Sequence, residues 1–209
     1  KKQIKEIQLI EKNQLIKKNQ LTKKIKIINP KKVSNYYYFS DHPEFKPNLS
    51  PIEVLSKGAF GGTYFRPIHS QVTQKDYQDR YKLYFSPQQL KKYKIKPETH
   101  LTIPFSEYNK SINKYQVKCG QTLEQWESKK WITKHDPYGW FEWYCNFFKG
   151  RRIEEEDKRQ IRRWLNFAGE KGRFSQRLRN MVKKRKTTLT DPTVSPVIRQ
   201  SLLHWGFEL

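Results

Sequence analysis

Cysteine, long apolar runs and acidic residues are all scarce in this sequence. The 209-residue chain has two cysteines, Cys119 and Cys145, in unrelated local contexts, which excludes a disulfide-stapled scaffold and a cysteine-based zinc module. Their scarcity favours a reducing compartment, so we expect an intracellular protein of the nucleus, the cytoplasm or the mitochondrion. We expect no metal site and no cofactor, because the other candidate ligands show no suitable spacing: His42, His69, His100 and His135.

A membrane-spanning segment is not expected either. No run approaches the roughly 18 consecutive apolar residues that a spanning helix needs. No apolar signal core precedes a small-residue cleavage site. The first residue is Lys1 and not Met. Removal of an organellar presequence would explain that, and so would a chain boundary of another origin.

Aliphatic side chains are few, but aromatic side chains are abundant. Hydrophobic residues make up 35% of the chain and aromatic residues 14%, with six Trp, twelve Tyr and twelve Phe. Large rings bury much apolar surface per residue, so they can form a core where aliphatics are scarce. Disorder of the whole chain is excluded, because disordered segments are poor in aromatics.

Positive charge is the strongest functional signal. The formal net charge is +23, and it is concentrated in two segments of +9 each, residues 1–32 and residues 151–186. The other 141 residues carry only +5 between them. Self-repulsion on this scale favours a polyanionic partner, of which nucleic acid is the commonest; acidic lipid and acidic protein surfaces are the alternatives.

The composition divides the chain into three parts. Residues 1–32 are a low-complexity Lys/Ile/Gln/Asn segment, for which a solvated tail and a basic amphipathic arm that orders on a partner are both open. Residues 33–118 are aromatic and contain several prolines, and we expect an irregular region packed on the core. Within it we expect extended, loop-like chain over 33–51, short helices at 77–85 and 87–93, and a short strand at 115–118. Residues 119–209 form the predicted basic helical domain.

Three glycines at Gly58, Gly61 and Gly62 invite comparison with a phosphate-binding loop. The comparison is weak, because no Lys-Ser/Thr pair follows and no buried apolar strand precedes. We expect a tight turn that brings the backbone close to an aromatic neighbour.

Helix signals are clearest after residue 119. Short helices are predicted at 123–131, at 137–149 with Asp136 as the cap and Gly150 as the stop, at 154–168, at 174–185 and at 196–209. The acids Glu154 to Asp157 complement the helix dipole. The predicted fold class is mainly α. The helices of about residues 136–209 form a small aromatic-cored domain of three to four short helices, preceded by an irregular, turn-rich region and a basic N-terminal arm.

The candidate site lies on the basic faces of the two helices within 151–186. A charged helix face is usually only solvated, but two such faces on consecutive helices, barely balanced by acids, favour phosphate contacts. The predicted nucleic-acid-binding residues are Arg151, Arg152, Arg159, Arg162, Arg163, Arg173, Arg177, Arg179, Lys183, Lys184, Arg185 and Lys186.

Catalytic chemistry has two weak candidates. Cys145 lies among aromatic residues, where a buried inert thiol is the simpler interpretation. His204 lies between Leu203 and Trp205, where a hydrogen-bonded core histidine is the simpler interpretation.

Four strings carry a family resemblance: GAFGGTYFRP (58–67), DPYGWFEWYCNFFKGRR (136–152), RQIRRW (159–164) and SPVIRQSLLHW (195–205). Together they resemble a family of basic proteins for which no activity is established. The resemblance implies that residues 52–209 are one evolutionary unit, and it supplies no catalytic residue, cofactor or substrate.

The sequence therefore predicts a non-enzymatic nucleic-acid-binding protein that contacts the phosphate backbone, with RNA slightly favoured over DNA. A structural component of a ribonucleoprotein or ribosome-like assembly, with protein neighbours, fits the basic body and lysine-rich arm. The alternatives are a structural protein on an acidic protein assembly and a nucleic-acid-modifying enzyme.

Overall fold

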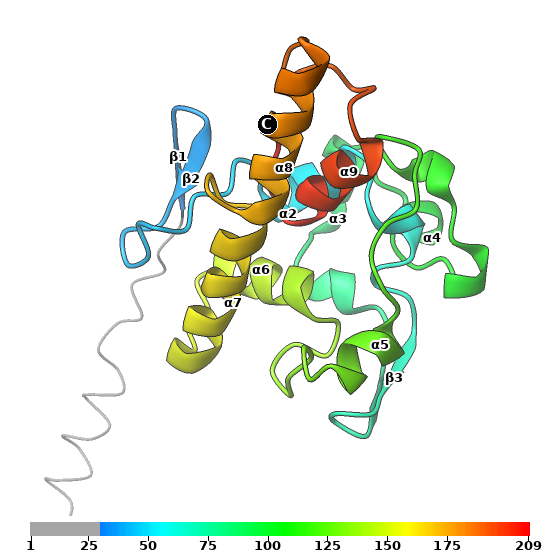
Figure 1. The fold of residues 1–209 in the computed structure, drawn as a ribbon. Coiled ribbons are helices and arrows are strands. Elements are labelled where there is room, and N and C mark those ends of the chain that lie inside the picture. Colours follow the sequence, from blue (N-terminus) through cyan, green and yellow to red (C-terminus); the bar gives the residue numbers. More distant parts are fainter. Residues whose placement is uncertain (1–29) are drawn as a thin grey trace, which may run out of the picture.

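The computed structural model describes residues 30–209 (Figure 1). Apart from its last three residues, the predicted basic arm over 1–32 lies outside the described chain. The fold is mainly helical, as predicted, with a buried aromatic core. Within the described range the α-helices are α2 (Pro51–Ser56), α3 (Pro87–Lys92), α4 (Pro97–His100), α5 (Leu123–Ser128), α6 (Trp140–Phe148), α7 (Glu154–Phe167), α8 (Arg173–Arg185) and α9 (Pro196–His204).

Short elements connect these helices. Two antiparallel hairpins, β1–β2 (Lys31–Val33, Tyr36–Tyr38) and β3–β4 (Ile68–Ser70, Lys75–Tyr77), are the sheets of the described chain. Four 3₁₀ turns, η1 to η4, are Phe60–Gly62, Arg80–Leu83, Phe105–Glu107 and Lys110–Ile112. None of the helices in residues 30–209 combines the length and the apolar character needed to cross a membrane.

Helix α6 lies at the centre of the core. Its side chains Trp143, Tyr144 and Phe147 are fully buried. Phe45, from the N-terminal segment, packs its ring against all three. Core residues run from Phe39 to Phe207, so the irregular region and the C-terminal helices share one cluster of buried side chains.

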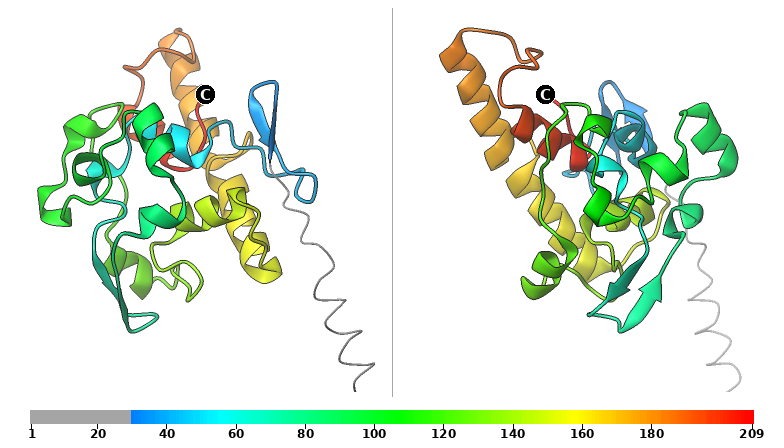
Figure 2. Two further views of the ribbon diagram at one scale, coloured as in Figure 1. Left: turned by 180° about the vertical axis from the view of Figure 1, so that it is seen from behind. Right: turned by 90° about the vertical axis from the view of Figure 1, so that its right-hand side faces the viewer.

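Helix α7 packs on α6, α8 packs on α7, and α9 packs on α8. Figure 2 shows α7 and α8 following one another as a column, with α9 against α8. The predicted acidic start of α7 is present: Asp157 accepts hydrogen bonds from the backbone N–H of Ile153 (2.7 Å) and from the indole N–H of Trp143 (2.8 Å). This carboxylate therefore holds the start of α7 onto α6.

The predicted start of α6 is wrong by three residues. Gly139, not Asp136, is the N-cap, with φ 87° and ψ −151°, a conformation that favours glycine. The carboxylate of Glu142 reaches back and accepts the N–H of Tyr138 at 2.9 Å. Asp136 is instead buried in an ion pair with Arg151.

Three further local predictions are wrong. The segment around Tyr36–Phe39, expected as extended loop, forms the β1–β2 hairpin. The segment 115–118, expected as a strand, has no regular structure. Helix α9 ends at His204 and not near residue 209, because the chain turns at Gly206 (φ 66°) and buries Phe207 in the core.

The glycine turn behaves as predicted. Gly61 has φ 56°, and a Cβ placed there would lie 2.5 Å from the Tyr108 ring, so only glycine fits. The backbone N–H of Phe60 donates to Nε2 of His204 (2.9 Å), and that of Gly61 donates to Oδ1 of Asn113 (2.8 Å). Both N–H groups are therefore occupied by side chains and are not free to bind a phosphate.

Candidate functional site

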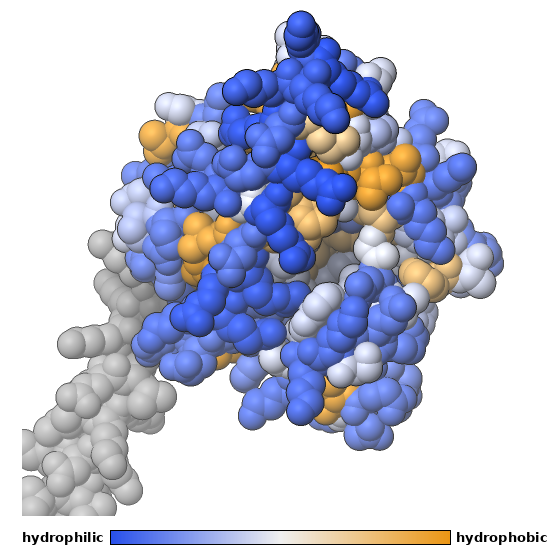
Figure 3. All heavy atoms as spheres, in the orientation of Figure 1, coloured by the Kyte–Doolittle hydropathy of each residue, from blue (hydrophilic) through white to orange (hydrophobic). Residues whose placement is uncertain are grey.

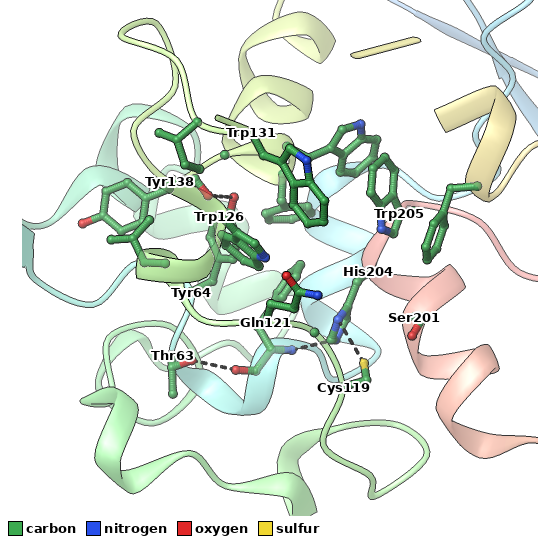
Figure 4. A pocket seen from close by; sticks show the side chains of 18 of the residues that line it. Thr63, Tyr64, Cys119, Gln121, Trp126, Trp131, Tyr138, Ser201, His204 and Trp205 are labelled. Carbon is green, nitrogen blue, oxygen red and sulfur yellow. Dashed lines mark hydrogen bonds between the residues drawn. The ribbon is translucent and has the colours of Figure 1, made fainter. Parts of the chain in front are cut away.

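A cavity of about 610 Å³ opens between α5, the junction of α7 with α8, and α9. Figure 3 shows the surface hollowed between the part that carries α5 and the parts that carry α8 and α9. In Figure 4, Trp126, Trp131 and Trp205 surround this space, with His204 and Gln121 nearby. Close to half of the lining residues are Phe, Tyr or Trp, and none is Asp or Glu. Among the described residues, the lining of the cavity is therefore rich in aromatic rings and has no acidic side chain.

One wall of the cavity is a continuous series of rings. Trp140 packs on Trp205 with ring centroids 4.5 Å apart, Trp205 stacks on Phe167 at 4.7 Å, and Phe167 stacks on Phe174 at 4.0 Å. We call these four residues the ring wall. Offset and stacked rings at such distances are favourable packing arrangements. The ring wall joins α6, α7, α8 and the end of α9, so it forms only when all four come together.

Arg163 lies between two of the cavity's tryptophans. Its guanidinium carbon is 5.3 Å from the Trp131 ring centroid and 5.5 Å from that of Trp205. Its only side-chain hydrogen bond within the described chain is to Oε1 of Gln160 (2.9 Å), and no carboxylate lies within ion-pair distance. Burial lowers the pKa of Arg163 to about 10. At the cavity the structure thus keeps a partly desolvated cation that has no ion-pair partner within residues 30–209.

Two more arginines line the same cavity. Arg173, exposed at the start of α8, places its guanidinium over the rings of Phe167 (5.6 Å) and Phe174 (5.4 Å). Arg66 lies over Phe105 (5.0 Å), donates to the carbonyl of Thr63, and has a pKa lowered by burial. Cations stacked on rings keep their N–H edges free for an anion.

Trp140 carries a buried donor without an acceptor. Its ring lines the cavity, but its indole nitrogen is closed off from solvent and has no hydrogen-bond partner within the described chain. An unsatisfied buried donor costs about 1–3 kcal/mol.

His204 contacts Cys119 at the base of the cavity. Its Nδ1 is 3.5 Å from the Cys119 sulfur, while its Nε2 accepts the Phe60 N–H and also faces the amide nitrogen of Gln200 at 3.1 Å. An Nε2 that accepts leaves the proton on Nδ1, which points at the sulfur. In this tautomer the imidazole donates to Cys119 and cannot take its proton.

The electrostatics agree with this assignment. Burial lowers the pKa of His204 to about 3 and raises that of Cys119 to about 11, so both groups are neutral near pH 7. Burial also raises the pKa of the Cys145 thiol, which lies in the core on α6. All three side chains fit structural roles, and His204 also ties α9 to the glycine turn.

The His204 assignment predicts a pH dependence of stability. The folded-state pKa of about 3 lies below the ordinary value of 6.5, so between these values the unfolded chain binds a proton that the folded chain refuses. The free energy of unfolding should therefore fall as pH drops below 6.5, by up to about 1.4 kcal/mol per pH unit. In His204→Gln, which keeps an acceptor near Nε2, this contribution should vanish. Urea unfolding of both proteins at pH 7, 6 and 5 measures it; parallel pH profiles would contradict the assignment.

Three of the predicted phosphate-binding arginines have internal partners. Arg151 makes two hydrogen bonds to the buried Asp136 (2.8 and 2.6 Å). Arg152 pairs with Asp41 (2.6 Å) and lies 3.7 Å from the Phe147 ring centroid. Arg159 pairs with Glu156 (2.7 Å). With Arg163 at the cavity, the predicted outward basic face of α7 is reduced to exposed Arg162, with Lys158 held by Glu154 (2.6 Å).

Helix α8 is different. Within residues 30–209, none of its basic side chains, nor that of its C-cap Lys186, lies within ion-pair distance of a carboxylate. Helical spacing places Arg173, Arg177 and Lys184 on the face opposite buried Leu178 and Val182. The members of this basic set are Arg173, Arg177, Arg179, Lys183, Lys184, Arg185 and Lys186.

The basic set and the cavity adjoin each other. Arg173 belongs to both, and the outward face extends from it to Lys184, about 16 Å along the helix axis at about 1.5 Å per residue. The charges of α8 were predictable from the sequence. The cavity was not, because its rings come from separate segments between residues 60 and 205. In the described part of the chain, no three His, Cys, Asp or Glu side chains cluster as metal ligands would.

Comparison with known proteins adds no family assignment: no family model, no curated protein and no solved structure matches this chain. The resemblance to a family of basic proteins therefore stays a prediction.

Proposed function

We propose that this protein is a non-enzymatic nucleic-acid-binding protein that contacts the phosphate backbone with the basic set of α8. The observation that carries the proposal is that these cations lack carboxylate partners among the described residues, whereas Arg151, Arg152 and Arg159 have them. Unpaired cations along one helix repel one another, and a polyanion removes that repulsion. Phosphate contacts also release counterions, which supplies affinity without base recognition.

RNA is our preferred partner, within a ribonucleoprotein or ribosome-like assembly. Support comes from the net charge of +23, the lysine-rich N-terminal sequence and the lack of a catalytic arrangement around Cys145 or His204. An acidic protein assembly would present negative charge to α8, as RNA does, so the experiment must distinguish these two partners.

The test is binding of the full chain to labelled single-stranded RNA, structured RNA and duplex DNA, each challenged with polyglutamate. We expect the nucleic acids to bind and RNA to bind best. Polyglutamate at equal charge concentration should compete poorly, because guanidinium groups match phosphate and spacing along the strand adds to charge. Displacement of RNA by polyglutamate at equal charge concentration would overturn the proposal and favour the acidic protein assembly.

A further inference from the structure

We infer that the aromatic cavity is a nucleotide-binding site, in which the base enters between the rings and the phosphate lies at Arg163 and Arg173. The inference rests on the proposed function and names the ligand that binds in the cavity next to α8. The shared chemistry is a nucleotide; its source is either a free nucleoside monophosphate or one unit of a single strand.

The rings of the cavity favour a base. Trp126 and Trp131 line the cavity beside the ring wall, and neither packs on another aromatic ring within residues 30–209. A planar ring fits among such surfaces, and stacking on an aromatic side chain contributes about 1–3 kcal/mol per base.

The argument for a phosphate starts from the arginines. Arg163 lies over Trp205, and Arg173 lies over Phe167 and Phe174, so each guanidinium group is next to the ring wall. Neither has a carboxylate partner within residues 30–209. Planar guanidinium groups bind phosphate oxygens through paired hydrogen bonds. An anion here neutralises the desolvated charge of Arg163.

Other ligand classes fit less well. Aromatic cages bind quaternary ammonium groups, but three arginines and no carboxylate line this one, so a cation is repelled. A neutral apolar ligand would leave Arg163 without a counter-charge. A planar ring with an attached anion satisfies both the rings and the arginines.

The cavity lies at one end of the basic face of α8, where a bound nucleic-acid strand could reach both. Arg173 lines the cavity and also begins the outward basic face of α8. A strand whose base enters the cavity would therefore continue along Arg177 and Lys184. A pocket for a base and a basic path for the backbone are the two parts of a single-strand binding surface.

The experiment titrates the full chain with adenosine 5′-monophosphate, adenosine, ribose 5-phosphate and oligo(A), following tryptophan fluorescence and isothermal heats. A nucleotide site predicts quenching by the monophosphate or the oligonucleotide, and at least tenfold weaker binding of adenosine and ribose 5-phosphate. Binding of the free monophosphate within tenfold of oligo(A) identifies a free nucleotide as the source; preference for oligo(A) by a hundredfold or more identifies a strand.

Matched variants locate the site. Arg163→Gln should weaken nucleotide binding at least tenfold, whereas Arg162→Gln removes the same charge from the neighbouring exposed position and should change it less than twofold. Trp131→Ala should weaken it similarly, and Trp131→Phe should restore most of the loss. Urea unfolding checks that each variant is folded.

The outcomes separate this inference from the proposed function. RNA binding that depends on α8 but is unchanged in Arg163→Gln and Trp131→Ala overturns the cavity inference and leaves the phosphate contacts intact. Nucleotide binding that is lost in Arg163→Gln, together with RNA binding insensitive to α8 substitutions, overturns the proposed function and keeps the cavity as a site for a free nucleotide.

Discussion

Replacing Arg177, Lys183, Lys184 and Lys186 by Gln should weaken RNA binding about a hundredfold near 0.15 M salt. These four side chains are exposed and have no carboxylate partner in the described chain. Each phosphate contact contributes about 0.7 to the slope of log K against log salt on a single strand. Losing four contacts should therefore flatten the slope by about 3, and that change corresponds to roughly two orders of magnitude at this salt concentration. Fluorescence anisotropy over a range of salt concentrations measures both quantities.

A charge-matched control separates contact from net charge. Substituting Lys91, Lys92, Lys94 and Lys96 by Gln removes four equally exposed cations on and just after α3. Both variants lower the net charge of +23 by four, so a general charge effect would alter them equally. We expect the α3 variant to change the slope by less than 1. Equal losses in the two variants would show that α8 is not the contact surface.

Arg151→Leu should destabilise the protein by about 3–5 kcal/mol. Arg151 donates two hydrogen bonds to Asp136, which is 1% exposed, and Asn146 donates a third (2.9 Å). Removing the guanidinium leaves a buried carboxylate without a counter-charge, which is the costly way to break such a pair. Urea unfolding followed by tryptophan fluorescence measures the loss. This prediction assigns Arg151 to the fold, in place of the phosphate contact expected from its position in the sequence.

Two comparisons control the Arg151 result. Adding Asp136→Asn to Arg151→Leu removes the orphaned charge and should recover part of the stability. Lys158→Ala breaks only the exposed pair with Glu154, so it should cost less than about 1 kcal/mol. A loss below 1 kcal/mol in Arg151→Leu, with no recovery in the double variant, would mean that the pair does not hold this part of the fold together.

The helices were predictable because their signals are local. The acids at the start of α7 and the apolar spacing of Leu178 and Val182 on α8 lie within single turns of the chain, and both helices fall close to the predicted ranges. The glycine turn was also predictable, since a cluster of glycines marks a close approach whatever the partner. The partner itself, Tyr108, lies 47 positions after Gly61 and left no local signal.

Ion pairs between distant residues were not predictable. Glu142 lies in an aromatic helix and is fully buried, because Arg80 reaches it from 62 residues away (2.6 Å) together with the hydroxyl of Tyr84 (2.7 Å). Asp136 was expected to cap α6, since Asp-Pro is a common helix start. The competing partner, Arg151, follows α6 in the sequence, and only the folded chain brings it within ion-pair distance of Asp136.

Of the candidate site, the basic residues of α8 were predictable from the sequence and the cavity was not. The basic residues of α8 lie in one short segment of the sequence and have no carboxylate partner among the described residues, whereas Arg151 and Arg152 pair with Asp136 and Asp41, which the fold brings to them. The cavity needs Trp131, Arg163, Phe174 and Trp205 together, and these come from four separate segments. In the sequence each of these residues resembles an ordinary core or surface residue, so none of them indicates a cavity.

The central claim is that one nucleic-acid strand lies along α8, and that a base of this strand enters the cavity at the N-terminal end of α8. Photo-crosslinking the full chain to a single-stranded RNA that carries 4-thiouridine, with the modified peptides mapped by mass spectrometry, tests it most directly. The account predicts crosslinks within residues 126–131 and 163–186. Crosslinks at α3 or the hairpins, with both of those segments unmodified, would contradict it.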